Sequence, residues 1–403
     1  MGFLHRTLAR TDAPAAFEYS PAWLDSGHAF VLDPRLDLWH GEQHPPADAP
    51  AFGVFMDSAP DRWGRVLMER REAAAATREG RALRILREVD FLLGVHDEAR
   101  MGGLRFRRLD GGPFLDDSAN AAPPVSSLRE LAAISRRVEE PGIEQLPEYE
   151  RWLAMLVAPG SSLGGARPKA NFRELDGSLW IAKFPARDDR YDVGAWEFVA
   201  HELALRAGIE VSPARLLAMG EGHRTFCTAR FDRIAAEAAA DRQEGRRMYA
   251  SAMTLLERRD GEPGASYLDL AQFIEDQGAR NQVSADLAQL FRRLLFNIAV
   301  GNRDDHLRNH GFIRVPTGWR LSPAFDMNPS NAKLEHALFI DGGSAAPEID
   351  RAMATAELYR LTQSQARGVL DEVRTAIGDW QTVAQQQGLG GAELQRMASV
   401  IQA

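Results

Sequence analysis

The chain has 403 residues, of which 45% are hydrophobic and 26% charged, and its formal net charge is −9 at pH 7. This length allows two or three domains with a sizeable core, and the negative charge argues against nucleic acid as a primary partner, because phosphate contacts need clustered cations. No run of residues approaches the roughly 20 apolar residues of a membrane helix, and the first residues lack the apolar core of a signal peptide. We therefore expect a cytoplasmic protein without a membrane partner.

Lysine and cysteine are both rare. Among the 48 Lys and Arg residues, only Lys169, Lys183 and Lys333 are lysines. Because a compact ammonium differs from a guanidinium fork, a lysine kept in such an Arg-rich chain is a candidate for chemistry that arginine cannot supply. The single cysteine, Cys227, stands in a strand-like run and is expected to be a buried packing residue without a disulfide.

The N-terminal part of the chain mixes two kinds of short segment. Residues 29–32 (Ala-Phe-Val-Leu) have the pattern of a strand, and residues 81–94 have the pattern of a helix. Residues 110–124 are rich in Gly, Pro and small residues, a composition typical of a linker. We predict an N-terminal subdomain over residues 1–125.

A glycine-rich segment opens the next part. Residues 160–169 run Gly-Ser-Ser-Leu-Gly-Gly-Ala-Arg-Pro-Lys. Glycines permit positive φ and close backbone approach, so that successive N–H groups can surround a phosphate. The segment is neither a Walker A motif nor G-x-G-x-x-G, and taken alone it favours a flexible turn. Its position ahead of Lys183 supports the phosphate-binding interpretation.

Lys183 and Glu197 follow in an order typical of kinases. Residues 179–184 alternate in polarity and predict a strand with Lys183 on one defined face. A kinase needs a strand lysine to neutralise the α- and β-phosphates, and it pairs that lysine with a glutamate on a helix. Glu197 lies in the amphipathic helix predicted for residues 195–203, with Glu202 as a competing candidate. The alternative is a surface lysine on an edge strand.

The strand predicted for residues 225–231 leads into Arg230-Phe231-Asp232-Arg233. This position suits a hinge that holds an adenine, but a structural Asp–Arg pair explains the same residues. After a polar, Ala-rich segment at 235–247 the pattern becomes helical. We therefore predict a strand-rich nucleotide lobe over residues 126–247 and a helical catalytic lobe over 248–403.

The strongest motif follows the helix predicted for residues 286–300, which Gly301 is placed to cap. Asp304 precedes Asn309 by five positions, the D-x-x-x-x-N spacing of a kinase catalytic loop. A hairpin at 312–321 then delivers Asp326, where a kinase places its second metal-binding carboxylate. Carboxylate and amide oxygens suit magnesium. Each aspartate alone is equally explained as a cap or turn residue, whereas the ordered set favours a kinase.

One residue argues against a zinc protease. His306 and His310 have the i, i+4 spacing of H-E-x-x-H, but Leu307 stands where that motif requires glutamate.

Taken together, these motifs resemble the HipA family of serine/threonine kinases, toxins of bacterial toxin–antitoxin modules. The resemblance extends over nearly the whole chain and includes the N-terminal stretch at 52–65 and the helical tail from about Tyr267. It implies an α+β, HipA-like and protein-kinase-like fold that uses ATP and Mg²⁺. The stretch after Asp326 lacks the A-P-E motif of eukaryotic-type kinases, as the family does.

The resemblance also implies a role for individual residues. Asp304 would be the catalytic aspartate, and Asn309 and Asp326 would hold magnesium. Ser162 matches the serine that the family autophosphorylates, although the adjacent Ser161 leaves the modified residue open. The implied ATP-binding residues are Gly164, Gly165, Ala166, Arg167, Lys169, Lys183, Arg230, Phe231, Asp232 and His306.

The implied partners are a HipB-like helix-turn-helix antitoxin, DNA only through that antitoxin, and a protein substrate, which in the family includes aminoacyl-tRNA synthetases. Two other functions fit the residues. A kinase for a small molecule or lipid would use the same side chains, and a catalytically inactive scaffold would bind antitoxin and DNA. The identity of the target does not follow from the sequence.

Overall fold

The structure is a computed structural model that describes residues 1–6, 13–116, 122–140, 142–146, 148–160, 167–220, 222–234 and 245–402. The chain forms two compact units. The first unit comprises Met1–Asp188 and Asp232–Tyr249, and the second comprises Asp189–Phe231 and Ala250–Ala403. The three-part division at residues 125 and 247 differs from these units and stays a prediction about domains.

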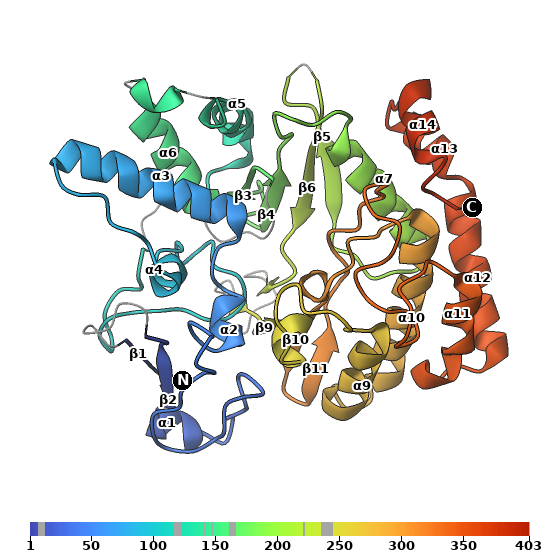
Figure 1. The fold of residues 1–403 in the computed structure, drawn as a ribbon, viewed down its shortest axis with the longest axis horizontal. Coiled ribbons are helices and arrows are strands. Elements are labelled where there is room, and N and C mark those ends of the chain that lie inside the picture. The colour runs from blue at the N-terminus through green and yellow to red at the C-terminus, as the bar shows by residue number, and fades with distance from the viewer. Residues whose placement is uncertain are drawn as a thin grey trace. The chain divides into compact units, whose positions relative to one another are not determined.

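The helices described for the first unit all lie in the N-terminal half of the chain (Figure 1). Its helices are α1 (Pro21–Leu24), α2 (Gly53–Met56), α3 (Arg62–Glu79), α4 (Glu88–Leu93), η1 (Val125–Ser127), α5 (Leu128–Val138), η2 (Ile143–Gln145) and α6 (Tyr149–Gly160). Its strands are β1 (Gly2–His5), β2 (Ala16–Tyr19), β3 (Lys169–Arg173), β4 (Leu179–Lys183), β7 (Arg233–Ile234) and β8 (Gly245–Arg246).

Helix α6 organises the packing around the β3–β4 hairpin. It contacts α3, α5 and β3, and its side chains Leu153 and Leu156 are buried. β3 and β4 pair antiparallel, with Ala170 opposite Ala182 in the core of the unit. The strand that the sequence predicted here is present as β4, but its burial does not alternate strictly, since Leu179 and Ala182 are buried while Trp180 and Ile181 between them are both partly exposed.

The second unit is mostly helical and contains two further hairpins (Figure 1). Its helices are α7 (Val193–Arg206), α8 (Ala252–Leu255), α9 (Tyr267–Gln277), α10 (Val283–Val300), η3 (Leu307–Asn309), α11 (Ile349–Ala354), η4 (Ala356–Tyr359), α12 (Gln363–Gly378), α13 (Trp380–Gln386) and α14 (Gly391–Met397). Its strands are β5 (Ala214–Leu217), β6 (Thr225–Ala229), β10 (Gly311–Val315) and β11 (Gly318–Leu321), and β9 (Tyr249–Ser251) spans the border of the two units along the chain.

Helix α10 forms the core of the second unit. It packs against α9 and α12, and all of its last eight residues are buried. It ends at Gly301, whose backbone is left-handed with φ +76°. A Cβ at this position would lie 2.4 Å from Cγ1 and 2.7 Å from the carbonyl oxygen of Val400. Only glycine therefore fits this turn, which directs the chain into the following loop.

Several predicted elements are confirmed. The strands at 179–183 and 225–229, the helix up to Val300 and the hairpin β10–β11 are all present. Helix α7 contains the predicted segment 195–203. Cys227 is a buried free cysteine, and burial raises the pKa of its thiol to about 12.

Two predictions for the N-terminal part were wrong. Residues 29–32 form no strand, because the N–H of Leu32 donates to the Tyr19 hydroxyl (2.9 Å) instead of a neighbouring strand. The helix predicted for 81–94 exists only as α4, since residues 81–87 have no regular structure. The longer helix α3 precedes it and ends at Gly80, which adopts φ +61°.

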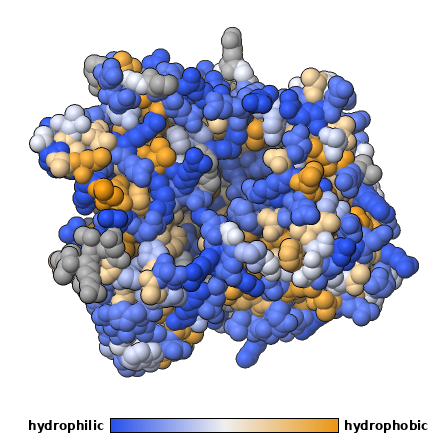
Figure 2. Space-filling view, in the orientation of Figure 1, coloured by the Kyte–Doolittle hydropathy of each residue, from blue (hydrophilic) through white to orange (hydrophobic). Residues whose placement is uncertain are grey.

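The surface is predominantly polar on the face that Figure 2 shows, where apolar side chains occur in separate groups. The most exposed large apolar residues are Leu175 in the first unit and Leu334 in the second. None of the helices within the described ranges is long and apolar enough to cross a membrane.

Candidate active site

The candidate site is built around the loop that follows α10, residues 301–310, which we call the 301–310 loop. Its first residues continue the contacts of the helix end. The backbone N–H of Asn302 donates to the Asn297 carbonyl (3.0 Å), and its side-chain amide donates to Oδ1 of Asn297 (3.1 Å). The Gly301 carbonyl accepts from the N–H of Ser330 (3.1 Å). The loop is therefore attached both to α10 and to the segment after Asp326.

Asp304 and Asn309, the two ends of the D-x-x-x-x-N motif, meet in the structure. Nδ2 of Asn309 donates to the Asp304 carbonyl oxygen (2.7 Å), and the N–H of Asn309 donates to the His306 carbonyl (2.8 Å). Because the amide nitrogen closes the loop, Oδ1 is the atom of Asn309 that can bind a cation. The Asp304 carboxylate is exposed and accepts from Nζ of Lys333 (2.5 Å).

The neighbouring Asp305 has the opposite environment. It is 1% exposed, and its carboxylate accepts from the Tyr267 hydroxyl (2.6 Å), from Nδ1 of His336 (2.8 Å) and from the N–H of Ala337 (3.0 Å). Tyr267 in turn accepts from Nδ2 of Asn297 (2.9 Å). These contacts join the start of α9, the end of α10 and residues 336–337 to the centre of the loop.

Charge is distributed asymmetrically in this buried network. Burial acts to raise the pKa of Asp305, but the hydrogen bonds from His336 and Tyr267 lower it below its usual value. Burial, followed by the negative charge of Asp305, raises the pKa of Tyr267 well above its usual value. Asp305 is therefore ionised and Tyr267 neutral at physiological pH. Arg303 extends the network by contacting Nε2 of His336 (2.9 Å).

His310 closes the loop as a buried, neutral imidazole. Its ring packs edge-on against Tyr267, with centroids 5.4 Å apart, and its carbonyl accepts from the N–H of Ala252 (2.8 Å). Burial lowers the pKa of His310 to about 4, although the charge of Asp305 acts to raise it.

We expect His310 to weaken the fold at acid pH. In the unfolded chain its pKa returns to about 6.5, so the unfolded state binds a proton first as the pH falls. The free energy of unfolding should therefore decrease between pH 6.5 and 4, by about 3 kcal/mol in total, and be independent of this group above pH 6.5. Urea unfolding at several pH values measures this, with His310→Gln expected to show a flatter acid limb than the wild type.

The matched control is the exposed His28. A His28→Gln variant should keep the wild-type dependence on pH, because this side chain is exposed and takes no part in the buried network. An unchanged acid limb in His310→Gln would contradict the prediction.

Asp326 stands beyond the hairpin β10–β11 with a backbone φ of +54°. This left-handed conformation is uncommon for residues other than glycine, although aspartate tolerates it better than most. The backbone just before Asp326 is held in place, because the N–H of Ala324 donates to the Glu210 carbonyl (2.8 Å). A small pocket connects this segment with the 301–310 loop, and its lining residues are Arg293, Asn297, Asn302, Asp305, Asn309, His310, Ala324, Phe325 and Met327.

The donor set at this pocket fits magnesium rather than a transition metal. Asn309 lines it, as do Phe325 and Met327 on either side of Asp326, although Asp326 itself is not among the lining residues. The side chains of Asn309 and Asp326 offer an amide oxygen and a carboxylate oxygen. Such hard oxygen ligands are those that Mg²⁺ prefers. Among the described residues, no group of three or more His, Cys, Asp and Glu side chains is placed to hold a metal ion. A magnesium ion would therefore need further oxygens from a bound molecule or water.

The predicted hinge motif divides at the border of the two units, between Phe231 and Asp232. Phe231 stacks on Phe325, the neighbour of Asp326, with centroids 5.5 Å apart, which brings two predicted site segments together. Arg230 is buried. Asp232 and Arg233 form an ion pair within the first unit (2.5 Å), so the structural Asp–Arg pair that the sequence left open is present.

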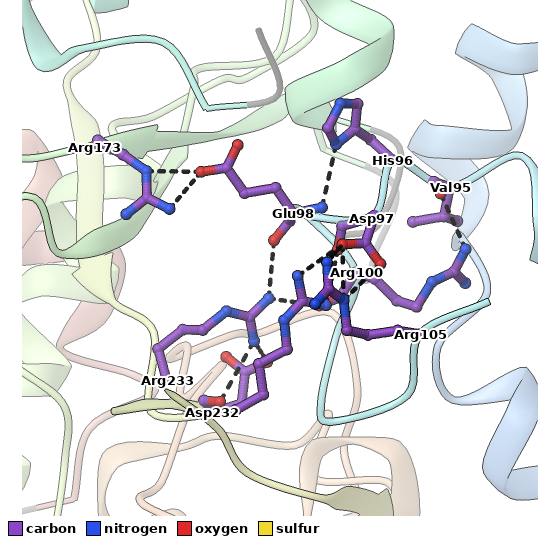
Figure 3. A network of polar contacts seen from close by, with 10 residues as sticks. Val95, His96, Asp97, Glu98, Arg100, Arg105, Arg173, Asp232 and Arg233 are labelled. Atoms are coloured by element: carbon purple, nitrogen blue, oxygen red, sulfur yellow. Dashed lines mark hydrogen bonds and ion pairs between the residues drawn. The ribbon is translucent and has the colours of Figure 1, made fainter. Parts of the chain in front are cut away.

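Figure 3 shows that this pair belongs to a larger arginine–carboxylate network of the first unit. Asp232 also accepts from the N–H of Gly102 (2.7 Å), and Arg233 donates to the carbonyl oxygens of Glu98 (2.9 Å) and Arg100 (2.7 Å). Asp232 is 1% exposed. Its carboxylate thus binds Gly102 directly and, through Arg233, residues 98 and 100. Direct contact of Asp232 with ATP stays a prediction.

Lys169 and Lys183 are brought together in the first unit. They are direct partners in the register of β3 and β4, and directly opposite residues of a pair of strands place their side chains on the same face. Two like charges at such positions disfavour the pairing unless an anion compensates them. Lys169 is buried, and its carbonyl accepts from Nε1 of Trp63 (3.1 Å). A phosphate-binding role for both lysines stays a prediction.

The remaining predicted residues are placed as follows. Glu197 is a buried residue of α7, whereas Glu202 is partly exposed near His201. Nδ1 of His306 is buried, and none of the described residues hydrogen-bonds to it. Arg167 is described and partly buried. The predicted loop residues Ser161, Ser162, Gly164, Gly165 and Ala166 lie outside the described residues.

Four residues of the site were missed by sequence reasoning: Asp305, Tyr267, His336 and Lys333. Asp305 is adjacent to Asp304, and because both are aspartates, the sequence gave no reason to assign them different roles. Tyr267 and His336 belong to no recognisable sequence motif. Lys333 had a signal, as one of three lysines, but no pattern connected it with Asp304.

Comparison with known proteins adds three findings. The family described as HipA-like C-terminal domain matches residues 161–380. The serine/threonine-protein kinase toxin HipA of Shewanella oneidensis is 25% identical over 227 residues, which are 51% of this chain and 50% of that protein. The chain thus matches about half the length of this relative.

A chain in the structure of the Shewanella oneidensis MR-1 toxin–antitoxin system HipA, HipB and its operator DNA complex has a similar fold. The TM-score is 0.67 at 19% identity, and the match covers 99% of this chain and 92% of that one. The predicted HipA-like α+β fold is therefore confirmed. Since the family match extends over more than half of the sequence and includes Lys169, Lys183, the 301–310 loop and Asp326, this chain belongs to the HipA family.

Proposed function

We propose that this protein is an ATP- and magnesium-dependent serine/threonine protein kinase that acts as a HipA-type toxin. The observation that carries the proposal is the 301–310 loop. It holds Asp304 exposed and Asn309 folded back against it, beside a pocket that Phe325 and Met327, the neighbours of Asp326, also line. These are the residue types that phosphoryl transfer to a hydroxyl requires. Membership of the HipA family supports the same function.

In this proposal each residue has one task. Asp304 orients the acceptor hydroxyl and accepts its proton, while Lys169 and Lys183 bind the phosphate oxygens of ATP. Oδ1 of Asn309 and the carboxylate of Asp326 would hold magnesium. When bound, magnesium neutralises charge on the phosphates during the transfer. The buried Asp305 network keeps the loop in one conformation.

The proposed partners follow from the relatives. The structural relative was solved with HipB and operator DNA, and we propose a HipB-like antitoxin as partner, with DNA reached only through it. The proposed substrate is a protein, for which an aminoacyl-tRNA synthetase is one candidate. Autophosphorylation at Ser161 or Ser162 would regulate the enzyme, because a phosphoserine adds charge where ATP phosphates bind.

Intact-mass measurement of the phosphatase-treated protein, after incubation with ATP and magnesium, tests the proposal. We expect the gain of a phosphoryl group that maps to Ser161 or Ser162, and labelled protein bands when a cell lysate is added. ATP binding without any labelled protein would favour a small-molecule or lipid kinase. Failure to bind ATP with magnesium, measured by calorimetry, would favour an inactive scaffold.

A further inference from the structure

The segment that follows Asp326 contacts the 301–310 loop at successive positions. The N–H of Ser330 donates to the Gly301 carbonyl (3.1 Å). Nζ of Lys333 contacts Asp304 (2.5 Å), and Nδ1 of His336 contacts Asp305 (2.8 Å). We call residues 330–337 the clamp segment. Its contacts follow the order of the loop residues from Gly301 to Asp305, so the two segments lie alongside each other.

The two ends of the clamp segment are fixed independently of Lys333. His336 is buried, and its N–H donates to the Ala345 carbonyl (2.9 Å). Beyond it, the N–H of Ala337 donates to Oδ1 of Asp305 (3.0 Å). Lys333 therefore projects from a backbone held on both sides, and its position at Asp304 does not depend on the ion pair alone.

The ion pair itself contributes little to folding. The side chains of Lys333 and Asp304 are 52% and 56% exposed, and exposed pairs add little to stability because water screens them and the long side chain loses entropy. A lysine retained at such a position in an Arg-rich chain needs another explanation. Asp304 is the residue proposed to orient the acceptor hydroxyl, and a carboxylate on an exposed loop has several rotamers unless a partner selects one.

We propose that Lys333 is a positioning residue of the phosphoryl-transfer site: its ammonium selects the orientation of the Asp304 carboxylate. This inference rests on the proposed kinase function. Lys333 acts through Asp304, since a misplaced carboxylate orients the acceptor hydroxyl poorly while ATP still binds to Lys169, Lys183 and the metal site. Loss of the ammonium should lower kcat and leave the KM for ATP nearly unchanged.

The first arm of the test needs no enzyme activity. The chain has three lysines, Lys169, Lys183 and Lys333, so acylation by an amine-reactive reagent can be followed at each one by peptide mass spectrometry. Lys333 should react faster in Asp304→Asn than in the wild type, because the pair with the carboxylate no longer occupies its amine. The buried Lys169 is the internal control and should react equally in both. Equal rates at Lys333 would overturn the inference.

The second arm measures transfer kinetics. We expect Lys333→Met to lower kcat about 10-fold to 100-fold, with Lys333→Arg retaining a larger part because it keeps the charge. Arg367→Met, on the exposed face of α12, is the matched control and should keep the wild-type kcat. In an Asp304→Asn background, Lys333→Met should have no further effect, because the group it positions is already absent.

The outcomes separate the two proposals. A wild-type kcat in Lys333→Met, or multiplied effects in the double variant, would overturn the positioning role while the kinase function stands. Absence of phosphoryl transfer by the wild type would overturn the kinase function and the positioning role with it. In that case the labelling result would still show whether Lys333 and Asp304 pair in solution.

Discussion

An Asp304→Asn variant is expected to lose phosphoryl transfer by about 10²-fold to 10⁴-fold, the range typical of removing a positioned general base. The amide has the same shape as the carboxylate but cannot accept the hydroxyl proton. Folding should be nearly unaffected, because the side chain is exposed and, among the described residues, its ion-pair and hydrogen-bond partner is Lys333. Transfer rates with saturating ATP, together with urea unfolding, measure both quantities on one preparation.

The matched control for this prediction is Asp350→Asn. Asp350 is an exposed residue of α11 with no part in the 301–310 loop, and its substitution should leave transfer and unfolding as in the wild type. If Asp304→Asn transferred phosphate at the wild-type rate, another group would have to receive the proton, and the role assigned to the D-x-x-x-x-N motif would be wrong.

Replacing the next residue, Asp305, should instead change the free energy of unfolding strongly. We expect Asp305→Ala to lower the free energy of unfolding by about 3–5 kcal/mol, because it leaves buried donors of Tyr267, His336 and Ala337 without their acceptor. Breaking a buried network by removing its charged centre costs more than any single hydrogen bond in it. The midpoint and slope of urea unfolding measure the loss.

Tyr267→Phe provides a graded comparison. It removes one hydroxyl and keeps the carboxylate with its other two donors, so we expect a smaller loss of about 1–2 kcal/mol. Because Asn297 also loses its contact with that hydroxyl, the loss should exceed that of an exposed hydrogen bond. If Asp305→Ala proved as stable as Asp304→Asn, the buried network would not hold the loop in solution.

The two adjacent aspartates are thus expected to differ, Asp304 affecting phosphoryl transfer and Asp305 affecting stability. In the sequence, Asp304 and Asp305 are the same residue type at consecutive positions, and the spacing to Asn309 favoured Asp304 only through a motif. In the structure, Asp304 is exposed and Asp305 is buried. The assignment of Asp304 to the acceptor hydroxyl agrees with this difference, since a buried and fully engaged carboxylate cannot reach an acceptor from outside.

Local patterns were enough to predict most elements of the second unit. The apolar periodicity of residues 286–300 predicted α10, and Gly301 predicted its end because the turn needs a left-handed backbone. Alternation predicted β4, and turn residues predicted the hairpin β10–β11. These features depend on residues within a few positions of one another, which is why a single sequence contains them.

Prediction failed where a distant side chain competed with the local pattern. Residues 29–32 have the apolar run of a strand, but their backbone bonds to Tyr19. The sequence likewise left the contacts of Asp232 open, and its carboxylate accepts from the N–H of Gly102, 130 positions earlier. Local propensity cannot report which partner a backbone or side chain finds after the chain has folded.

The sequence by itself determined the residue types of the site, their order along the chain and the elements that carry them: the strand of Lys183, the helix before Gly301, and the hairpin before Asp326. Only the tertiary structure decided which of these residues are buried and what they contact. Lys333 meets Asp304 across 29 positions, and Tyr267 meets Asp305 across 38. The physical reason is that helix and strand periodicity act over a few residues, whereas burial and pairing depend on the packing of segments that are distant in the chain.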